Sequence, residues 1–465
     1  MPAAIAPSLT VAERQELGRS ARTRLPRSSL ADYVVAQDRP DPVALLETQA
    51  TTRVAELVPI RYGRMLASPL SFYRGAAMIM ASDLATGSQT GQQVQLCGDA
   101  HLSNFGLFAS PERNLVFELN DFDETLPGPW EWDVKRLLAS LAVAGRSNGF
   151  DAAECEQVVR ATAEGYRIRM LALAEMRELD LWYAQTCVND ALIASVDSTF
   201  GHQIRRTAAK AKSRNHLQAL AELTRLVDGQ RRLASDPPLL VPIDELVGEA
   251  EAHAHEHHMG VLIRTYLQSL ETNRRVLANR FRYVGMARKV VGVGSVGTRA
   301  WIVLMMGRDE NDPLLLQVKE AQPSVLEFYL PPSAYENAGE RVVVGQRLMQ
   351  AAGDILLGWL HAVGPDGHEG DYYVRQLRDW KGSANVQSMN AKVLADYGRS
   401  CGEVLARAHA RTGDRIAIAS YLGKGDQADR ALVRYAAAYA DQNDLDYKVL
   451  RETVASGRLA ARYDL

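Results

Sequence analysis

Two short stretches of the sequence gather carboxylate and amide side chains beside apolar runs. "LCGDAHLSNFGLF" contains Asp99, His101 and Asn104, and "FELNDFDET" follows it with Asp121 and Asp123. A carboxylate can accept the proton of a reacting hydroxyl, and carboxylate and amide oxygens are ligands that Mg²⁺ prefers. Carboxylates that lie close together repel one another, and a divalent cation relieves this repulsion. These residue types therefore indicate a metal-assisted transfer reaction.

The spacing of Asp99 and Asn104 is typical of the catalytic loop of a kinase, in which the catalytic Asp stands five residues before a metal-binding Asn. A second metal-binding Asp follows on a later strand turn of such enzymes, and Asp121 stands in the corresponding place here. The alternative is a turn in which the Asp and Asn side chains cap backbone groups. We favour the first interpretation because motifs further along the chain agree with it.

A glycine motif near the middle of the chain has the spacing of a phosphate-binding loop. "GVGSVG" supplies Gly292, Gly294 and Gly297 as a complete G-x-G-x-x-G. In a dinucleotide-binding fold this motif opens a helix, but here the strand-like run "TRAWIVLMM" follows. A strand–glycine–strand flap is the kinase arrangement, in which glycines let backbone N–H groups approach phosphate oxygens.

The same arrangement requires a lysine on the third strand of the sheet. "LLLQVKEA" supplies Lys319. A buried lysine in a strand is costly unless it meets an anion, so a phosphate partner is favoured over a plain hairpin with a surface lysine. The glutamate that pairs with this lysine in a kinase is left open between Glu327 and Glu340, with a slight preference for Glu340.

Several motifs together resemble a known family. "GDAHLSNF" and "FELNDFDETLPGPWEWDVKRLLASL" resemble the G-D-x-H-x-x-N…D-F-x…G-P…D signature of the aminoglycoside- and choline-kinase-like phosphotransferases. With "PIRYGRM", "SPLSFYRGAA" and "YYVRQLRDWKGS", the chain more closely resembles an uncharacterised bacterial family, domain of unknown function 2252, over nearly its whole length. The resemblance implies a kinase-like fold and brings no established substrate.

The resemblance also implies a role for each matching residue. Asp99 would be the catalytic base, and His101 would orient it by a hydrogen bond. Asn104 and Asp121 would hold Mg²⁺. Asp133 in "EWDVKRL" would support the catalytic loop from the following helix.

Three departures from the family pattern affect this interpretation. Cys97 stands where those kinases usually have His, and Asp123 stands where a protein kinase has the glycine of D-F-G, adding a carboxylate that could also bind metal. The order of the motifs is inverted, because the catalytic loop precedes the glycine flap. We therefore expect a circularly permuted, two-lobed α+β kinase-like fold, which is tolerable where the original termini lie close together at the surface.

The apolar pattern predicts the elements that position these residues. A helix is predicted over 61–84 with an interruption near Pro69, and helical character over 130–233. "QQVQLCGD" and "RNLVFELNDFD" predict two strands joined by a turn at 110–112. The predicted domains are an N-terminal extension with one or two short helices (1–60), a helix-rich catalytic lobe (61–281), a β-rich nucleotide-covering lobe (282–382) and C-terminal helices that complete the catalytic lobe (383–465).

The bulk composition excludes several classes of protein. A net charge of −3 argues against nucleic-acid binding through the overall field. Four cysteines lie far apart with no C-x-x-C pair, which favours free thiols in a reducing compartment. The sequence has no signal-like N-terminus and no run of about 18 apolar residues. We therefore expect a cytoplasmic globular protein.

Other charged groups are weaker candidates. Arg74, Arg375 and Lys381 could contact phosphate or the acceptor, although ordinary ion pairs are equally compatible. "HAHEHH" has the spacing of metal ligands but reads as a polar helix end, and "RRTAAKAKSR" reads as a solvated helix face.

Taken together, these motifs predict an ATP- and Mg²⁺-dependent phosphotransferase that acts on a hydroxyl, with a small molecule as the more probable acceptor. One alternative is a nucleotidyl transferase that moves AMP to a protein and binds ATP in a reversed pose. Another is a nucleotide-binding protein without turnover. The presence of Asp99 together with Asn104 and Asp121 counts against the latter, because binding alone requires no base.

Overall fold

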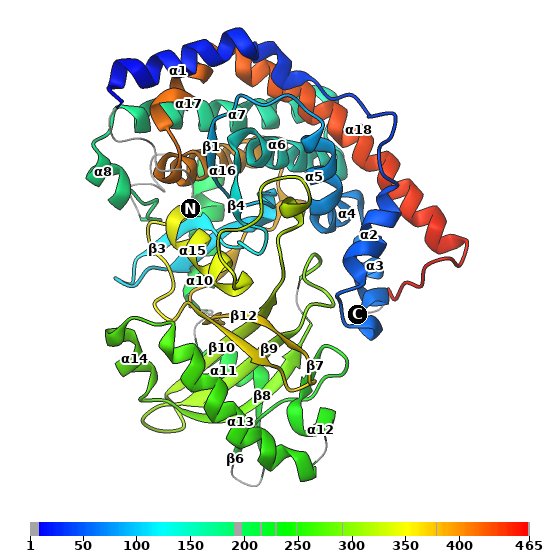
Figure 1. The fold of residues 1–465 in the computed structure, drawn as a ribbon, viewed down its shortest axis with the longest axis vertical. Helices are drawn as coiled ribbons and strands as arrows, with labels where there is room; N and C mark the ends of the chain where they lie inside the picture. The colour runs from blue at the N-terminus through cyan, green and yellow to red at the C-terminus, as the bar shows by residue number, and fades with distance from the viewer. Residues whose placement is uncertain are drawn as a thin grey trace.

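The computed structural model of the chain describes residues 9–189, 198–213, 216–227, 230–247, 249–290, 292–377 and 379–463. It has mixed α+β architecture in two parts, a helix-rich part and a sheet-containing part, which follow one another along the longest axis (Figure 1). Both ends of the chain contribute helices to the first part, and the middle of the chain forms the sheet. No helix in these ranges has the length and apolarity of a membrane span.

The helix-rich part contains segments from both halves of the chain. Its most extensive helix–helix contact joins α7 and α16, with α6 and α18 beside them. A capping box of Asp151 and Glu154 begins α7, so two backbone N–H groups at this end are satisfied. The helices are α1 (Val11–Arg24), α2 (Pro42–Ala50), α3 (Val58–Met65), α4 (Pro69–Gly75), α5 (Ala77–Ala85), α6 (Trp130–Ser147), α7 (Ala152–Ala174), α8 (Glu178–Tyr183), α16 (Ala391–Thr412), α17 (Arg415–Leu422) and α18 (Gln427–Ala455).

The predicted helical segment 61–84 is interrupted as expected. Ser68 caps α4 through its side chain, and Pro69 occupies the first turn, where a missing N–H costs nothing. The N-terminal segment is less of an extension than the sequence indicates, because α1 packs against α17 and α2 packs against α18.

Short strands beside α6 carry the candidate catalytic loop. β1 (Gln93–Leu96) pairs with β4 (Leu126–Pro129), whereas β2 (Phe105–Ala109) pairs with β3 (Leu115–Leu119) and with β13 (Gly382–Ser383). The sequence pattern predicts that a turn at 110–112 joins a strand in "QQVQLCGD" to a strand in "RNLVFELNDFD". This prediction is wrong, because the turn at 110–114 joins β2 to β3. The strand β2 begins directly after the loop, and no turn residue separates the two, so β2 was not predicted from the sequence.

The second part is built on a six-stranded antiparallel sheet of order β11-β12-β10-β9-β8-β7. Its strands are β7 (Leu240–Pro242), β8 (Arg282–Lys289), β9 (Ala300–Met306), β10 (Pro313–Ala321), β11 (Gly358–Val363) and β12 (Glu369–Gln376). Its helices are α12 (Ile243–Val247), α13 (Glu249–Gln268), α14 (Thr272–Ala278) and α15 (Ala338–Met349). Tyr266 and Trp301 share a core here that is separate from the helical core. The sheet-containing part therefore begins before residue 282.

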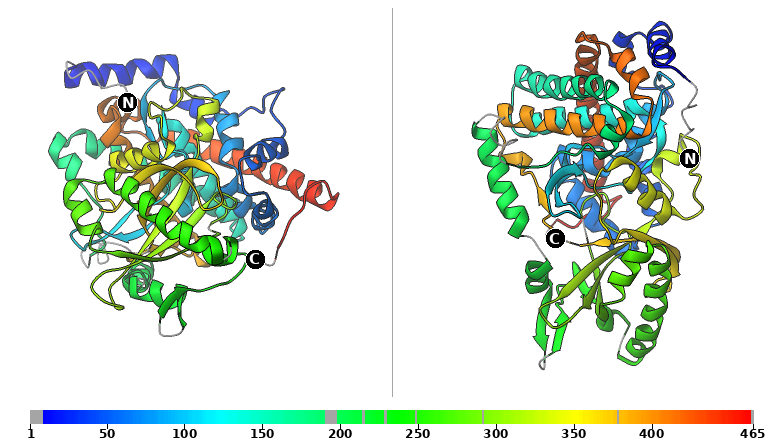
Figure 2. Two further views of the ribbon diagram at one scale, coloured as in Figure 1. Left: turned by 60° about the horizontal axis from the view of Figure 1, so that its bottom comes forward. Right: turned by 90° about the vertical axis from the view of Figure 1, so that its left-hand side faces the viewer.

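The segment before β7 connects the two parts. α10 (Ser198–Ser213) contacts α16, and α11 (His216–Leu223) packs on β10 (Figure 2). The helix predicted to continue to residue 233 ends at Leu223, because β5 (Thr224–Val227) and β6 (Gln230–Leu233) form a hairpin. The sequence Asp-Gly between these strands favours a hairpin turn, so the hairpin could have been predicted from the sequence.

Lys135 on α6 is a buried charge whose removal should stabilise the fold. Its side chain lies over the Tyr435 ring, with the ammonium 4.3 Å from the ring centroid, and burial lowers its pKa to about 8. Because an unfolded lysine has a pKa of about 10.4, the unfolded chain holds more protons between these two values, and wild-type stability rises with pH across this window. We expect Lys135→Met to raise the free energy of unfolding by about 2 kcal/mol at pH 7. Denaturant unfolding should show this gain in full below pH 8 and its loss toward pH 10, and a gain that is independent of pH would contradict the prediction.

Candidate active site

A cavity of about 960 Å³ lies between the two parts of the molecule and brings together motifs that are far apart in the sequence. Of the predicted residues, those that line it are Arg74, Asp99, His101, Asn104, Asp121, Asp123, Gly292 and Gly294. Lys319 does not line it but contacts Asp123, which does. Asp133 and Gly297 lie behind the lining, where they contact Cys97 and Val54. Arg375 and Lys381 instead line a second cavity of about 390 Å³.

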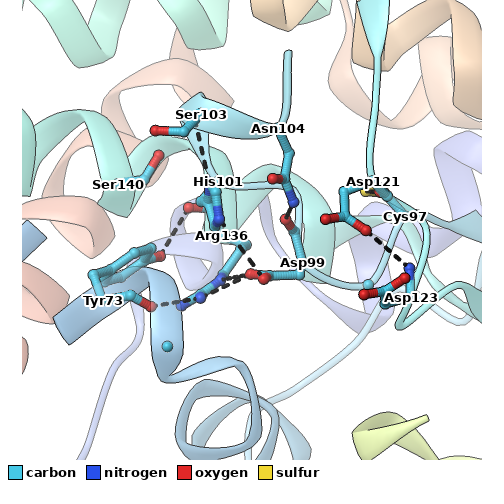
Figure 3. Close-up of polar contacts among 12 residues, drawn as sticks. Tyr73, Cys97, Asp99, His101, Ser103, Asn104, Asp121, Asp123, Arg136 and Ser140 are labelled. Carbon is cyan, nitrogen blue, oxygen red and sulfur yellow. Dashed lines mark hydrogen bonds and ion pairs between the residues drawn. The ribbon is translucent and has the colours of Figure 1, made fainter. Parts of the chain in front are cut away.

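One face of α6 holds the loop that contains Asp99. Asp133 accepts hydrogen bonds from the backbone N–H groups of Cys97, at 2.7 Å, and Gly98, at 3.0 Å. Two turns further along the helix, Ser140 Oγ accepts from the N–H of Leu102 at 2.9 Å. Residues spaced by three and seven lie on one face of a helix, so a single helix face fixes the whole loop, as Figure 3 shows in part. The predicted supporting contact of Asp133 is thus present.

A buried network extends this support. His409 Nε2 on α16 lies 3.2 Å from the Asp133 carboxylate, and His409 Nδ1 lies 2.9 Å from the Tyr166 hydroxyl on α7. The loop is therefore tied through Asp133 to two long helices of the core. His409 could not be predicted as part of this site, since nothing in its local sequence links it to residue 133.

Asp99 is oriented by Arg136, which the sequence analysis also missed. Arg136 Nε and Nη2 lie 2.9 and 2.8 Å from Asp99 Oδ1, and the guanidinium stacks on the Tyr73 ring (Figure 3). Asp99 Oδ2 has only His101 Nε2 nearby, at 3.8 Å, and a fifth of the side chain is exposed. Burial raises the pKa of the Asp99 carboxyl, and Arg136 opposes this rise. One carboxylate oxygen is thus fixed while the other remains available to the cavity.

His101 is not arranged as a base, and its Nε2 lies 3.8 Å from Asp99 Oδ2, which is beyond hydrogen-bond distance. Its Nδ1 accepts from the backbone N–H of Ser103 at 3.2 Å, so the neutral ring carries its proton on Nε2, which faces Asp99. Burial, with the charges of Arg74 and Arg136, lowers the pKa of His101 well below its usual value. The ring is therefore neutral near pH 7.

The open end of the β2–β3 hairpin brings Asn104 and Asp121 together. Asn104 precedes β2 and Asp121 follows β3, and the N–H of Asn120 donates to the Asn104 carbonyl at 2.8 Å. The Asn104 amide donates to the Asp99 carbonyl at 2.5 Å. Burial and the neighbouring Asp123 charge raise the pKa of Asp121. Across the described ranges, no group of three or more His, Cys, Asp and Glu side chains is arranged to hold a metal, so a cation here would need ligands from other sources.

Lys319 joins the sheet to the loop after β3. Its side chain is 2% exposed, and its Nζ lies 2.5 Å from Asp123 Oδ2 and 3.2 Å from Ser295 Oγ in the glycine loop. The Tyr373 hydroxyl donates to Asp123 Oδ1 at 2.6 Å. Although burial acts in the opposite direction, Lys319 and Tyr373 hold the pKa of Asp123 well below its ordinary value. Both oxygens of Asp123 are engaged in these contacts, which do not favour its predicted auxiliary metal role.

The prediction that Glu340 pairs with Lys319 is wrong, because Asp123 is the partner of Lys319. Glu340 lies in the first turn of α15, and its neighbour Arg341 faces the site. Adjacent helical side chains point about 100° apart. The buried Arg341 donates to the carbonyls of Asp123 and Thr125 at 2.8 and 2.7 Å.

The glycine motif forms the loop between the antiparallel strands β8 and β9, as predicted for a flap. Gly292 and Gly297 have φ values of 64° and 90°, which disfavour other residues. The loop is held from the helix-rich part, since Arg64 Nη1 donates to the Gly292 carbonyl at 2.6 Å and the N–H of Val54 donates to the Gly297 carbonyl at 2.8 Å.

The remaining candidates lie away from this arrangement. Arg375 donates to Gln317 Oε1 at 3.0 Å and to the Asn120 carbonyl at 3.1 Å, which is a structural role beside the site. The histidines of "HAHEHH" belong to α13, and their side chains lie outside the described residues.

Gly98 gives a test of the loop geometry. Its φ is 86°, and a Cβ atom there would lie 2.2 Å from the carbonyl oxygen of Glu124. We expect Gly98→Ala to lower the free energy of unfolding by about 3 kcal/mol, because strain in φ and a backbone clash add. Gly149→Ala is the matched control, since Gly149 has a φ of 80° but open space around it and should lose only about 1 kcal/mol. Equal losses in denaturant unfolding would contradict this account.

Comparison with known proteins gives one relationship. No curated protein and no solved structure matches the chain. A family described as an uncharacterized protein conserved in bacteria, DUF2252, matches residues 53–453, which is most of the chain. The protein therefore belongs to the DUF2252 family.

Proposed function

We propose that this protein is an ATP- and Mg²⁺-dependent phosphotransferase that acts on a hydroxyl group. The observation that carries the proposal is the contact of Lys319 on β10 with Asp123 and with Ser295 of the glycine loop. This contact joins three predicted motifs at the wall of the cavity that also contains Asp99. A plain hairpin with a surface lysine would not produce it.

The arrangement of the sheet supports a kinase-like fold. The glycine loop connects β8 and β9, Lys319 stands on the neighbouring strand β10, and α15 follows. The loop with Asp99 precedes all of these elements in sequence and meets them only across the cavity. This is the order that a circularly permuted kinase would have, with its nucleotide-covering lobe formed by the middle of the chain.

The chain's own residues suit the transfer step. Asp99 Oδ2 would accept the proton of the acceptor hydroxyl as the new oxygen–phosphorus bond forms and the bond to the departing nucleoside diphosphate breaks. Arg136 would hold Asp99 in position, and Lys319 would bind phosphate oxygens after exchanging part of its contact with Asp123. Catalysis would come mainly from positioning and charge stabilisation.

The side chains near Asp99 fit a magnesium ion in part. Asn104 Oδ1 and the Asp121 carboxylate are hard oxygen donors at the end of one hairpin. When bound, Mg²⁺ would neutralise charge on the phosphate oxygens. Its remaining ligands would be phosphate oxygens and water, which is the usual composition of such sites.

Thermal unfolding with ATP, in Mg²⁺ and in EDTA, tests the proposal. Ligand at a hundred times its dissociation constant should stabilise the wild type by about 2.7 kcal/mol. This gain should require Mg²⁺ and should disappear in Asp121→Asn, which keeps the shape of the side chain and removes the charge. The absence of any shift with nucleotide in the wild type would sink the proposed function.

Product mass separates phosphoryl transfer from the nucleotidyl alternative. A phosphoryl group adds about 80 Da to the acceptor, and an adenylyl group adds about 329 Da. We expect the former on a small molecule. An adenylyl adduct on a protein would replace this proposal with the AMP-transfer reaction.

A further inference from the structure

Arg61 is a fully buried arginine on the cavity wall with an unsatisfied guanidinium. Its side chain is 0% exposed, and Nη2 donates to Gln49 Oε1 at 2.8 Å and to the Gly75 carbonyl at 3.0 Å. Its Nε and Nη1 have no hydrogen-bond partner. The cavity that it lines is the one that contains Asp99.

Two further arginines of the same wall are partly buried and have an unsatisfied Nε, although Arg53 also donates from Nη1 to the Val296 carbonyl. Arg53 and Arg74 line the cavity, and the Nε of each is buried without a partner. Within the described part of the chain, no carboxylate lies within ion-pair distance of Arg53, Arg61 or Arg74. Arg74 lines the cavity together with Asp99, and it follows Tyr73, whose carbonyl accepts a hydrogen bond from the Arg136 that holds Asp99.

Arginines buried elsewhere in this protein are paired. Arg407 lies 2.6 Å from Glu118, Arg136 lies 2.8 Å from Asp99, and Arg167 lies 2.8 Å from Asp429. Burying a cation without a counter-charge is costly, so such groups are normally paired or meet a ligand. Three unpaired guanidinium groups on one cavity wall therefore indicate a missing anion.

We propose that Arg53, Arg61 and Arg74 form a second anion site that binds a phosphate or carboxylate group carried by the acceptor. Guanidinium groups match planar and tetrahedral oxyanions through paired N–H donors. Arg61 and Arg74 stand on α3 and α4, whereas Lys319 stands on β10 of the sheet. Arg53 lies between these two groups, because it donates to the Val296 carbonyl of the glycine loop. Since Arg74 is close to Asp99, an acceptor anchored here would present its hydroxyl to the base.

This inference rests on the proposed phosphotransferase and narrows its substrate class. The acceptor would be a hydroxyl compound with an anionic group, and an acceptor with ammonium groups would be repelled. The same oxyanion chemistry could come from the terminal phosphate of the nucleotide, so the test must separate the two sources.

The test measures thermal unfolding with inorganic phosphate as the probe, alone and in the presence of Mg²⁺ with a saturating non-hydrolysable ATP analogue. We expect phosphate to raise the unfolding temperature of the wild type in both conditions. Arg61→Met and Arg74→Met should weaken the apparent phosphate affinity about tenfold or more, since each removes a charged hydrogen-bond donor. Both should retain the response to the Mg²⁺–analogue complex.

Stability without ligand provides an independent readout. Arg61→Met removes an unpaired buried charge and should leave the unfolding temperature equal or higher. The matched control Arg407→Met leaves Glu118 buried without its partner and should lower it. A similar loss in both variants would mean that Arg61 is a structural residue and would overturn the site.

The remaining outcomes distinguish the two proposals. Phosphate that stabilises the wild type only when the nucleotide analogue is absent would assign the arginines to the nucleotide and overturn the acceptor site. No response to phosphate in either condition would overturn it as well. A response to phosphate that is lost in Arg61→Met, without any response to nucleotide, would support the anion site and overturn the phosphotransferase.

Discussion

Asp99→Asn should lower phosphoryl transfer by about 10²–10⁴-fold, the usual contribution of a positioned general base. The variant keeps the size of the side chain and can still accept hydrogen bonds from Arg136 through its amide oxygen. It cannot take a proton from the acceptor. Binding of Mg²⁺ and ATP should persist, because Asn104 and Asp121 are the proposed metal ligands and remain in place.

The measurement for Asp99→Asn is release of ADP during transfer to water, which requires no knowledge of the acceptor. Asp379→Asn is the matched control, since Asp379 pairs with the exposed Arg113 and should show no change in turnover. Thermal stabilisation by ATP with Mg²⁺ is measured in parallel. Turnover that survives in Asp99→Asn would remove this residue as the base, and a loss of nucleotide response would assign it to binding instead.

Lys319→Met should lower the free energy of unfolding by about 3 kcal/mol. Removing the lysine leaves Asp123 charged and close to the Asp121 carboxylate, with only Tyr373 and Ser295 as neutral partners. Breaking a buried ion pair usually costs about 3–5 kcal/mol of stability. We expect the lower value here, because 31% of the Asp123 side chain is exposed. The response to ATP with Mg²⁺ should also be lost.

A double variant separates stability from function at this pair. Lys319→Met combined with Asp123→Asn removes both charges and should recover a large part of the lost stability, as replacing a whole buried pair often does. It should not recover the response to nucleotide, since Lys319 is the proposed phosphate ligand. Lys448→Met on the exposed surface is the control and should change stability by no more than about 0.5 kcal/mol. A double variant that binds nucleotide would contradict the role of Lys319.

The local geometry of the site could be predicted from the sequence. Asn104 and Asp121 stand at the ends of two neighbouring segments, although the strand β2 that makes them the two ends of one antiparallel hairpin was not predicted. Asp133 reaches the loop because it stands in the first turn of the helix that follows. The glycine loop joins β8 to β9 and Lys319 stands on the next strand, β10, for a similarly local reason. Spacing along a strand, turn or helix fixes these relations, since backbone geometry repeats over a few residues.

The ion-pair partners of the site residues depend on the tertiary structure and could not be predicted from the sequence. Lys319 pairs with Asp123 rather than Glu340, and Arg136 orients Asp99 although sequence analysis passed over it. The burial of Arg61 and its unsatisfied Nε and Nη1 likewise could not be predicted, because its local sequence is equally compatible with a surface arginine. Which charged groups meet depends on how the two separate cores bring distant segments together. This packing results from many weak contacts, none of which is specific enough to be recognised in the sequence. Local spacing in the sequence therefore fixes the candidate motifs and their immediate surroundings, whereas the packing of the two parts sets which charged groups face one another across the cavity and which arginines lack a carboxylate partner.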